Sequence, residues 1–256
     1  MNMYKRIKQR IKNIIRYDDK IRIQWKKTSS QGELFKHYPF KNYKPYHKRI
    51  YETIEENVRL TGEKGNLPLW DGYDHLNDYR PHEGKQRNVY QVRSSATICK
   101  FYTELVSKIK PETIIEIGGA FGVSGMYWLA GIKMNNAGFL YSFEPNKIWS
   151  SIANQNLASI DHRFNLVNAT FEEQCQNILN NVKCFQVAFI DAIHTSKFVF
   201  NQYELLKNYA RSGTVILFDD INFSRDMQVC WESISKKDEV LSSFQINNRV
   251  GVIELR

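Results

Sequence analysis

The sequence has few cysteines, and none is spaced as a metal or redox motif requires. Cys99, Cys175, Cys184 and Cys230 lie far apart, with no C-x-x-C pair among them. Zinc ribbons and thioredoxin-like sites depend on that spacing, so neither class is indicated. We therefore expect four reduced thiols.

Long apolar runs are also missing. No stretch of about 18 apolar residues occurs, which argues against a membrane-spanning helix. The N-terminal stretch lacks the uninterrupted apolar core of a secretory signal, so a cytoplasmic location is the expectation. With 42% hydrophobic and 25% charged residues over 256 positions, the composition is that of an ordinary globular protein. The length suits one sizeable α/β domain with an appendage.

Acidic charge is scarce only near the N-terminus. Residues 1–50 carry 15 Lys and Arg against 3 Asp and Glu, whereas the remainder carries 21 against 24. Such a basic segment is either a solvated face or a contact for a polyanion. The isoleucines between Ile7 and Ile15 have helical spacing and predict an amphipathic helix. We expect it to dock on the body or on the second subunit of a homodimer, with weak membrane-surface contact as the alternative.

The chain divides into two segments near residue 89. Residues 1–89 are rich in basic and aromatic residues and turn signals, with a helix at 48–60, and predict a helical and irregular cap. Residues 90–256 predict the α/β domain. Its first helix is capped by Ser94 or Ser95 and ends before Pro111.

Short β-rich apolar runs alternate with helical stretches after Pro111. Strands are predicted at 113–117, 139–144, 164–168, 186–191 and 214–219. This order predicts a Rossmann-like, mostly parallel sheet with helices on both faces. Two last runs, 243–246 and 250–255, flank a short turn and predict a terminal antiparallel hairpin, which makes the sheet seven-stranded. Ligands are expected at the carboxyl ends of the strands.

A glycine-rich turn follows the first predicted strand. The strand ends near Glu116, and Gly118, Gly119 and Gly122 precede the next helix. Glycine lets the backbone approach a ligand and adopt positive φ without steric cost. The spacing is not G-x-G-x-x-G, which disfavours a nicotinamide-dependent oxidoreductase. Glu144, at the end of the second strand, is placed to accept both hydroxyls of a ribose.

These motifs resemble those of the class I S-adenosylmethionine-dependent methyltransferases, through IIEIGGAFGVSG, SFEPN and NATFEE. The resemblance covers about residues 90–256. It implies that the glycine turn with Glu116 holds the methionine part of S-adenosylmethionine and that Glu144 binds the ribose. Ala120, inside the turn, inherits no glycine role. The adenine is expected against the segment after the third strand: Ala169, Thr170 and Phe171.

Three carboxylates are predicted to meet at one edge of the sheet. Asp191 ends the fourth strand, and Asp219 and Asp220 end the fifth. Such a cluster repels itself unless a cation, a proton or a cationic ligand is present, and its oxygens suit Mg²⁺ or Mn²⁺. All three are therefore candidate metal ligands. The alternative is that they close the site or orient the cofactor amine, and Asp191 is also a candidate cofactor contact.

The arrangement is similar to that of the metal-dependent catechol-type O-methyltransferases, in which an acid after the fourth strand and an acid–amide pair after the fifth hold the metal. Asp220 stands where that pattern has asparagine, and His194 stands where it has the lysine that deprotonates the acceptor. An imidazole titrates near neutral pH, so His194 and Asp191 are the predicted catalytic residues. The alternative for His194 is a histidine that only hydrogen-bonds the backbone at a helix start.

The resulting hypothesis is methylation of a small polar or sugar-like acceptor, most simply O-methylation. N-methylation and a non-catalytic nucleotide-binding or scaffold protein of the same fold are the alternatives. A nucleic-acid substrate is not expected, because the Asn/Asp-Pro-Pro-aromatic motif is missing and basic charge is confined to the N-terminal arm. Candidates for the acceptor pocket are Trp70, Tyr73, His75 and Tyr79.

Overall fold

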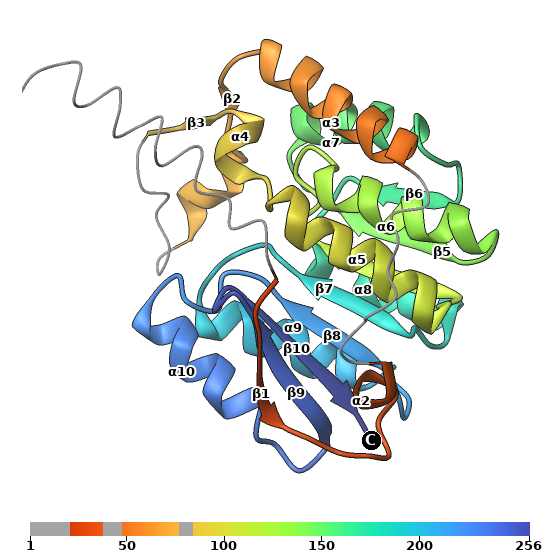
Figure 1. Ribbon diagram of the computed structural model, residues 1–256. Coiled ribbons are helices and arrows are strands. Elements are labelled where there is room, and N and C mark those ends of the chain that lie inside the picture. The colour runs from red at the N-terminus through yellow and green to blue at the C-terminus, as the bar shows by residue number, and fades with distance from the viewer. Residues whose placement is uncertain (1–20, 38–47, 77–83) are drawn as a thin grey trace, which may run out of the picture.

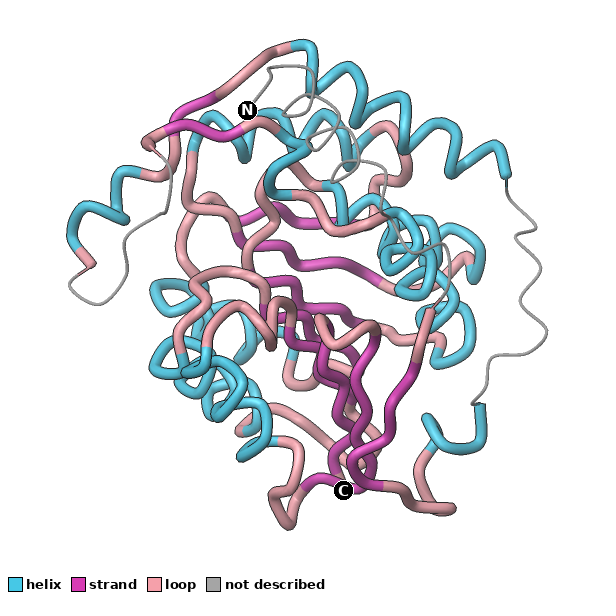
Figure 2. The backbone as a smooth tube through the Cα atoms, turned by 60° about the vertical axis from the view of Figure 1, so that its left-hand side comes forward, coloured by secondary structure: helices cyan, strands magenta, loops and turns pink. Residues whose placement is uncertain are grey.

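The computed structural model describes residues 21–37, 48–76 and 84–256, which are arranged around one sheet of eight strands (Figure 1, Figure 2). The strand order is β1-β9-β10-β8-β7-β4-β5-β6. Strands β4 to β8 are parallel to one another, and β10, β9 and β1 continue the sheet in antiparallel pairs. The strands are β1 (Ile23–Lys27), β4 (Thr113–Ile117), β5 (Phe139–Phe143), β6 (Phe164–Val167), β7 (Val187–Ile190), β8 (Val215–Phe218), β9 (Val240–Ile246) and β10 (Val250–Leu255).

Helices cover both faces of this sheet (Figure 1). One face carries α5 (Ala96–Ile109), α6 (Val123–Asn135) and α7 (Lys147–Ala158), with α3 (Lys48–Glu63) packed outside them. The other carries α8 (Phe171–Val182), α9 (Ser196–Lys207) and α10 (Arg225–Ile234). Helix α6 is buried at every position from Val123 to Ile132, which explains why its sequence is apolar on all sides.

The position of β4 decides where a ligand can bind. β4 lies between β5 and β7, so the chain builds the sheet first on one side of β4 and then on the other. The loops that follow β4 and β7 therefore run to opposite faces of the sheet and leave a crevice at the carboxyl ends of these two strands. Short elements lie before α5 in the chain: α2 (Glu33–His37), β2 (Leu67–Pro68), the 3₁₀ helix η1 (Asp71–His75), β3 (Gln86–Arg87) and α4 (Val89–Val92).

The predicted fold class is confirmed, with one strand more than the seven predicted. β1 comes from the N-terminal segment and pairs with β9, so that Trp25 lies opposite Phe244 with the ring centroids 4.9 Å apart. The sequence signal for this strand is weak because it is short and ends in Lys26 and Lys27, and charged residues are typical of a sheet edge.

Two smaller expectations can be compared with the structure. The four cysteines are free, and Cys99, Cys175 and Cys230 are buried. In the part of the chain that the structure describes, no helix is long and apolar enough to cross a membrane. The amphipathic helix predicted between Ile7 and Ile15 lies outside the described residues.

Replacing Trp25 tests whether β1 stabilises the sheet. Trp25 is half-buried against Phe244. We expect Trp25→Ala to lower the free energy of unfolding by about 2 kcal/mol, less than for a fully buried tryptophan. Gln24→Ala, at the exposed neighbouring position, removes only the oxygen that accepts from Gln245 Nε2 and should lower it by no more than about 1 kcal/mol. Urea denaturation followed by fluorescence measures the stability of both variants. Equal losses would contradict the conclusion that Trp25 anchors β1 to the sheet.

Candidate functional site

A cavity of about 340 Å³ opens at the predicted edge of the sheet. Gly118, Phe143, Asp191 and Asp220 line it, and each lies at or just beyond the carboxyl end of a parallel strand. Another part of the wall comes from the segment before α5, including Leu69, Trp70, Tyr73 and residues 91–93. The site thus lies between the sheet and the N-terminal segment.

The glycine turn has the backbone geometry that the sequence predicts. Gly118 has φ of 93°, and its N–H and that of Gly119 both donate to the carbonyl oxygen of Phe143 at 3.0 Å. A Cβ atom on Gly118 would overlap the carbonyl oxygen of Asp191. No residue but glycine is therefore accommodated there without a shift of the backbone.

The other predicted turn residues shape the site without lining the cavity. Gly122 has φ of 79° and begins α6, and a Cβ there would lie 3.2 Å from the backbone of Ala153 in α7. Glu116 is fully buried beneath the turn and accepts a hydrogen bond of 2.6 Å from Ser142. Burial raises the pKa of Glu116. Gly119 packs so closely on Ser142 that a Cβ would lie 2.5 Å from its Oγ.

Glu144 lies at the cavity wall with its carboxylate held by backbone donors. The N–H groups of Ala120 and Asn146 donate to its two oxygens, each at 2.7 Å. Burial, with a smaller contribution from Glu116, raises the pKa of Glu144 to about 7. Ala120 itself lines the cavity at φ of 45°, although its residue type gave no reason to expect a left-handed conformation. Each carboxylate oxygen keeps acceptor capacity for a ribose hydroxyl.

Two of the three residues predicted against the adenine, Thr170 and Phe171, line the cavity, and Thr170 also caps α8. Thr170 accepts a hydrogen bond from the N–H of Glu173, whose side chain accepts from the N–H of Thr170, so the two form a capping box at the start of α8. Phe171 is buried, lines the cavity and contacts Phe143 edge to face at 5.2 Å. Ala169 does not line the cavity.

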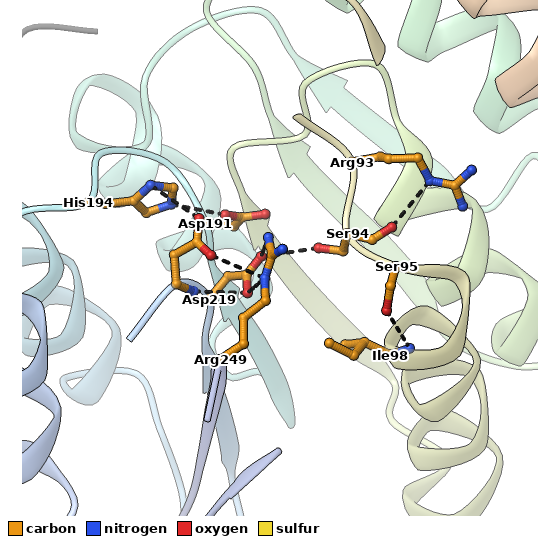
Figure 3. A network of polar contacts seen from close by, with 9 residues as sticks. Arg93, Ser94, Ser95, Ile98, Asp191, His194, Asp219 and Arg249 are labelled. Carbon is orange, nitrogen blue, oxygen red and sulfur yellow. Dashed lines mark hydrogen bonds and ion pairs between the residues drawn. The ribbon is translucent and has the colours of Figure 1, made fainter. Parts of the chain in front are cut away.

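His194 and Asp191 face each other in the cavity, as Figure 3 shows. Nε2 of His194 lies 3.1 Å from Oδ1 of Asp191, and Nδ1 lies 3.7 Å from Oδ2 of Asp220. Burial and the nearby charge of Asp219 raise the pKa of Asp191 to about 8. Burial alone would lower the pKa of His194, but the hydrogen bond to Asp191 and the charges of the carboxylates outweigh it and raise that pKa.

Arg249 completes the cluster, and the sequence analysis missed it. Its Nε and Nη2 donate to the two oxygens of Asp219, both at 2.9 Å (Figure 3). Nε also lies 3.1 Å from Oδ1 of Asp220. Ser94 donates to the same Asp219 carboxylate at 3.1 Å. Burial alone would raise the pKa of Asp219, but the Arg249 guanidinium outweighs it and lowers that pKa.

The predicted metal site does not fit this arrangement. Asp219 has no exposed side-chain surface and is covered by the guanidinium, while Asp191 is engaged by His194. Within residues 21–37, 48–76 and 84–256, no three His, Cys, Asp or Glu side chains are grouped so that they could hold a metal ion. The physical reason is that a cation of the chain itself neutralises the acids.

The aromatic candidates for the acceptor pocket are only partly brought together. Trp70 and Tyr73 line the cavity and contact each other at 5.5 Å, whereas His75 does not line it. Tyr79 lies outside the described residues. Phe223, from the loop after β8, also lines the cavity, and its ring centroid lies 5.3 Å from that of His194.

Comparisons with known proteins agree with this fold. A family described as "Methyltransferase domain" matches residues 115–221. The chain is 24% identical, over 78% of its length and 81% of the relative's, to a protein of Dictyostelium discoideum named "Probable caffeoyl-CoA O-methyltransferase 3".

Solved structures of two O-methyltransferases share the fold. An O-methyltransferase from Bacillus cereus in complex with SAH has a TM-score of 0.59 at 20% identity, covering 79% of this chain and 90% of that one. TomG from Streptomyces achromogenes, in complex with SAM, has a TM-score of 0.56 at 15% identity, covering 80% and 89%. At these identities the likeness concerns the fold.

Replacing Gly118 tests the close approach of the turn to Asp191. Gly118→Ala combines a left-handed conformation with a steric overlap, so we expect the free energy of unfolding to fall by at least about 3 kcal/mol. Gly213 is a matched control, because it has φ of 85° with nothing within 4 Å of an added Cβ. Gly213→Ala should cost about 1–2 kcal/mol. If urea denaturation gave similar losses of stability for the two variants, the overlap of the new Cβ with Asp191 would be relieved without a cost in free energy.

Proposed function

We propose that this class I S-adenosylmethionine-dependent methyltransferase transfers a methyl group to a hydroxyl oxygen of a small polar acceptor. The observation that carries the proposal is that one cavity holds a buried carboxylate suited to a ribose, Glu144, and an imidazole suited to proton removal, His194. The cofactor and the reaction class agree with the relatives, whose names include O-methyltransferases. The choice of acceptor is our inference from the cavity.

The walls of the cavity fit the cofactor. Glu144 presents a carboxylate that is only 5% exposed and still has acceptor capacity for two hydroxyls. Gly118 provides backbone without a side chain at the turn, and Phe143 with Phe171 forms an apolar wall. Bound S-adenosylmethionine supplies a methyl group activated by the positive charge on its sulfur.

His194 is placed to remove the proton of the acceptor. Above the pKa of about 8 of Asp191, its ionised carboxylate only accepts hydrogen bonds, so we assign the proton of the neutral imidazole to Nε2, where it is donated to Asp191. Nδ1 then carries the lone pair that takes a proton. Asp191 acts by orienting the ring, as the third member of a nucleophile–base–orienter arrangement does.

Methyl transfer forms one bond, breaks one bond and releases one proton. The acceptor oxygen forms a bond to the methyl carbon, and the carbon–sulfur bond breaks with its electron pair remaining on sulfur. The acceptor proton passes to His194 and then to solvent. The main contribution of the protein is to hold the two reactants in line, with the reacting atoms about 3–3.5 Å apart.

The acceptor subsite lies between the sheet and the N-terminal segment. Trp70 and Tyr73 form its aromatic side, and Phe223 lies beside His194. This combination of rings and hydrogen-bonding groups favours a small acceptor with a planar or sugar-like body and a hydroxyl group. A cytoplasmic location and a homodimer stay predictions from the sequence.

Binding of S-adenosylhomocysteine tests the cofactor site. We expect micromolar binding by calorimetry and a loss of about 10- to 100-fold in Glu144→Gln, because charge-assisted hydrogen bonds to the ribose are lost. Glu112→Gln, at an exposed position at the other end of β4, is the control and should bind as the wild type does. Absence of binding to the wild type would refute the proposed function.

The affinity should also depend on pH through Glu144. Its pKa is raised to about 7, and the ionised form is the one that accepts the ribose hydroxyls. Below pH 7, binding must release the proton of Glu144, so Kd should rise by about tenfold for each unit by which the pH is lowered. Above about pH 7, Kd should not depend on pH. Glu144→Gln should abolish the dependence, and an unchanged slope in this variant would assign it to another group.

Replacing His194 tests the proposed base. His194→Gln should reduce kcat by about 100-fold or more while leaving the affinity for S-adenosylhomocysteine unchanged. His162→Gln, at an exposed histidine outside the cavity, is the control. The assay follows radiolabelled methyl transfer from S-adenosylmethionine to a panel of small catechols, phenols and sugars. Full activity of His194→Gln on any acceptor would exclude the histidine as base.

A further inference from the structure

The terminal hairpin places Arg249 beside the acidic cluster. Asn247 and Asn248 adopt left-handed φ values of 50° and 55°, as a two-residue hairpin turn requires, and the N–H of Arg249 donates to Ile246 at 2.9 Å. β10 pairs with β8 in a register that sets Gly251 opposite Phe218. Continued by two residues, this register brings Arg249 to Asp220.

The loop after β8 fixes this position further. The N–H of Ile221 donates to the carbonyl oxygen of Arg249 at 3.0 Å, so the backbone of the arginine is tied to the loop that carries Asp219 and Asp220. The position of the guanidinium is therefore fixed by the backbone as well as by the conformation of the side chain. The contact is built into the pairing of the sheet.

The contacts of the guanidinium occupy the place where a divalent cation would lie. Arg249 contacts Asp219 through two donors and Asp220 through Nε, which are two of the three acids predicted as metal ligands. The third, Asp191, is bonded to His194. A metal ion here would have to displace a guanidinium that is held by the buried Asp219 and the half-buried Asp220, and like charges at such distances repel strongly.

Part of the guanidinium is still available to a ligand. Nε and Nη2 contact the carboxylates, and Nη1 has no hydrogen-bond partner in the part of the chain that the structure describes. Arg249 lines the cavity together with His194, and its side chain keeps 33% of its surface exposed. The outer edge of the fork, made by Nη1 and the second hydrogen of Nη2, is a hydrogen-bond donor pair on a side chain that lines the same cavity as the proposed base.

We propose that Arg249 is the resident cation of this site: it takes the place of a divalent metal and donates from Nη1 to the acceptor oxygen that receives the methyl group. The proposal rests on the methyltransferase function proposed above. It predicts methyl transfer without added metal. A donor aimed at the acceptor oxygen stabilises the negative charge that develops there when His194 takes the proton.

Binding of Mn²⁺, followed by electron paramagnetic resonance, tests whether the guanidinium fills a cation site. Arg249→Met leaves three carboxylates without their resident cation, and we expect it to bind Mn²⁺. The wild-type protein should bind none at the concentration that saturates the variant. Arg211→Met is the matched control, because Arg211 is exposed and precedes β8 at the opposite edge of the sheet, and it should behave as the wild type does.

Each other result of this titration overturns the proposal. Binding of Mn²⁺ to the wild type would show that a metal displaces the arginine. Binding to neither protein would show that the acids form no cation site for Arg249 to fill, and equal binding to both variants would show an unspecific effect of charge. Should Arg249→Met not fold by circular dichroism, Arg249→Gln replaces it, and the wild-type titration remains decisive.

Turnover gives a second, independent measurement. Wild-type activity should be unchanged by EDTA, and Arg249→Met should lose about 100-fold in kcat, comparable to the loss of one oxyanion donor. Loss of wild-type turnover in EDTA would refute metal independence. The Mn²⁺ titration needs no cofactor or acceptor, so its outcome is separable from failure of S-adenosylhomocysteine to bind, which would refute the methyltransferase function itself.

Discussion

The buried carboxylate of Asp219 is the constraint on which the site depends. Its side chain has no exposed surface, and a charge in such a place costs several kcal/mol unless it is paired and hydrogen-bonded. The structure supplies Arg249 from the last hairpin and Ser94 from the start of α5. Three segments that are distant in the sequence are therefore held at one point of the sheet, and the walls of the cavity form around them.

The neighbouring acids are stabilised by different means, and this divides their roles. Backbone N–H groups of the turn and of Asn146 hold Glu144, so its position follows from the fold of the β4–α6 connection. An imidazole holds Asp191, which gives that pair a proton to exchange. The cavity thus has a carboxylate suited to hydroxyl groups on one side and a proton-transfer pair on the other. A methyltransferase needs both within reach of one ligand.

The predictable parts of the fold are those with strong local signals. β4 and β10 have the predicted bounds, because buried strands are short apolar runs between breaking residues. β1 was missed because its lysines obscure the alternation, and its pairing with β9 depends on residues more than two hundred positions away. Glu144 and His194 were found because Glu144 ends one predicted strand and His194 closely follows another. Arg249 carries no such signal, and only the pairing of β10 with β8 assigns it to the site.

The sequence by itself determined the order of strands and helices, the glycine turn and the acids at strand ends, since these follow from residue type and spacing. It also determined that three carboxylates meet at one edge and need a positive charge. The tertiary structure decided which charge that is. A metal ion and a guanidinium satisfy the same electrostatic requirement, and the choice between them depends on a register between antiparallel strands that no local pattern encodes.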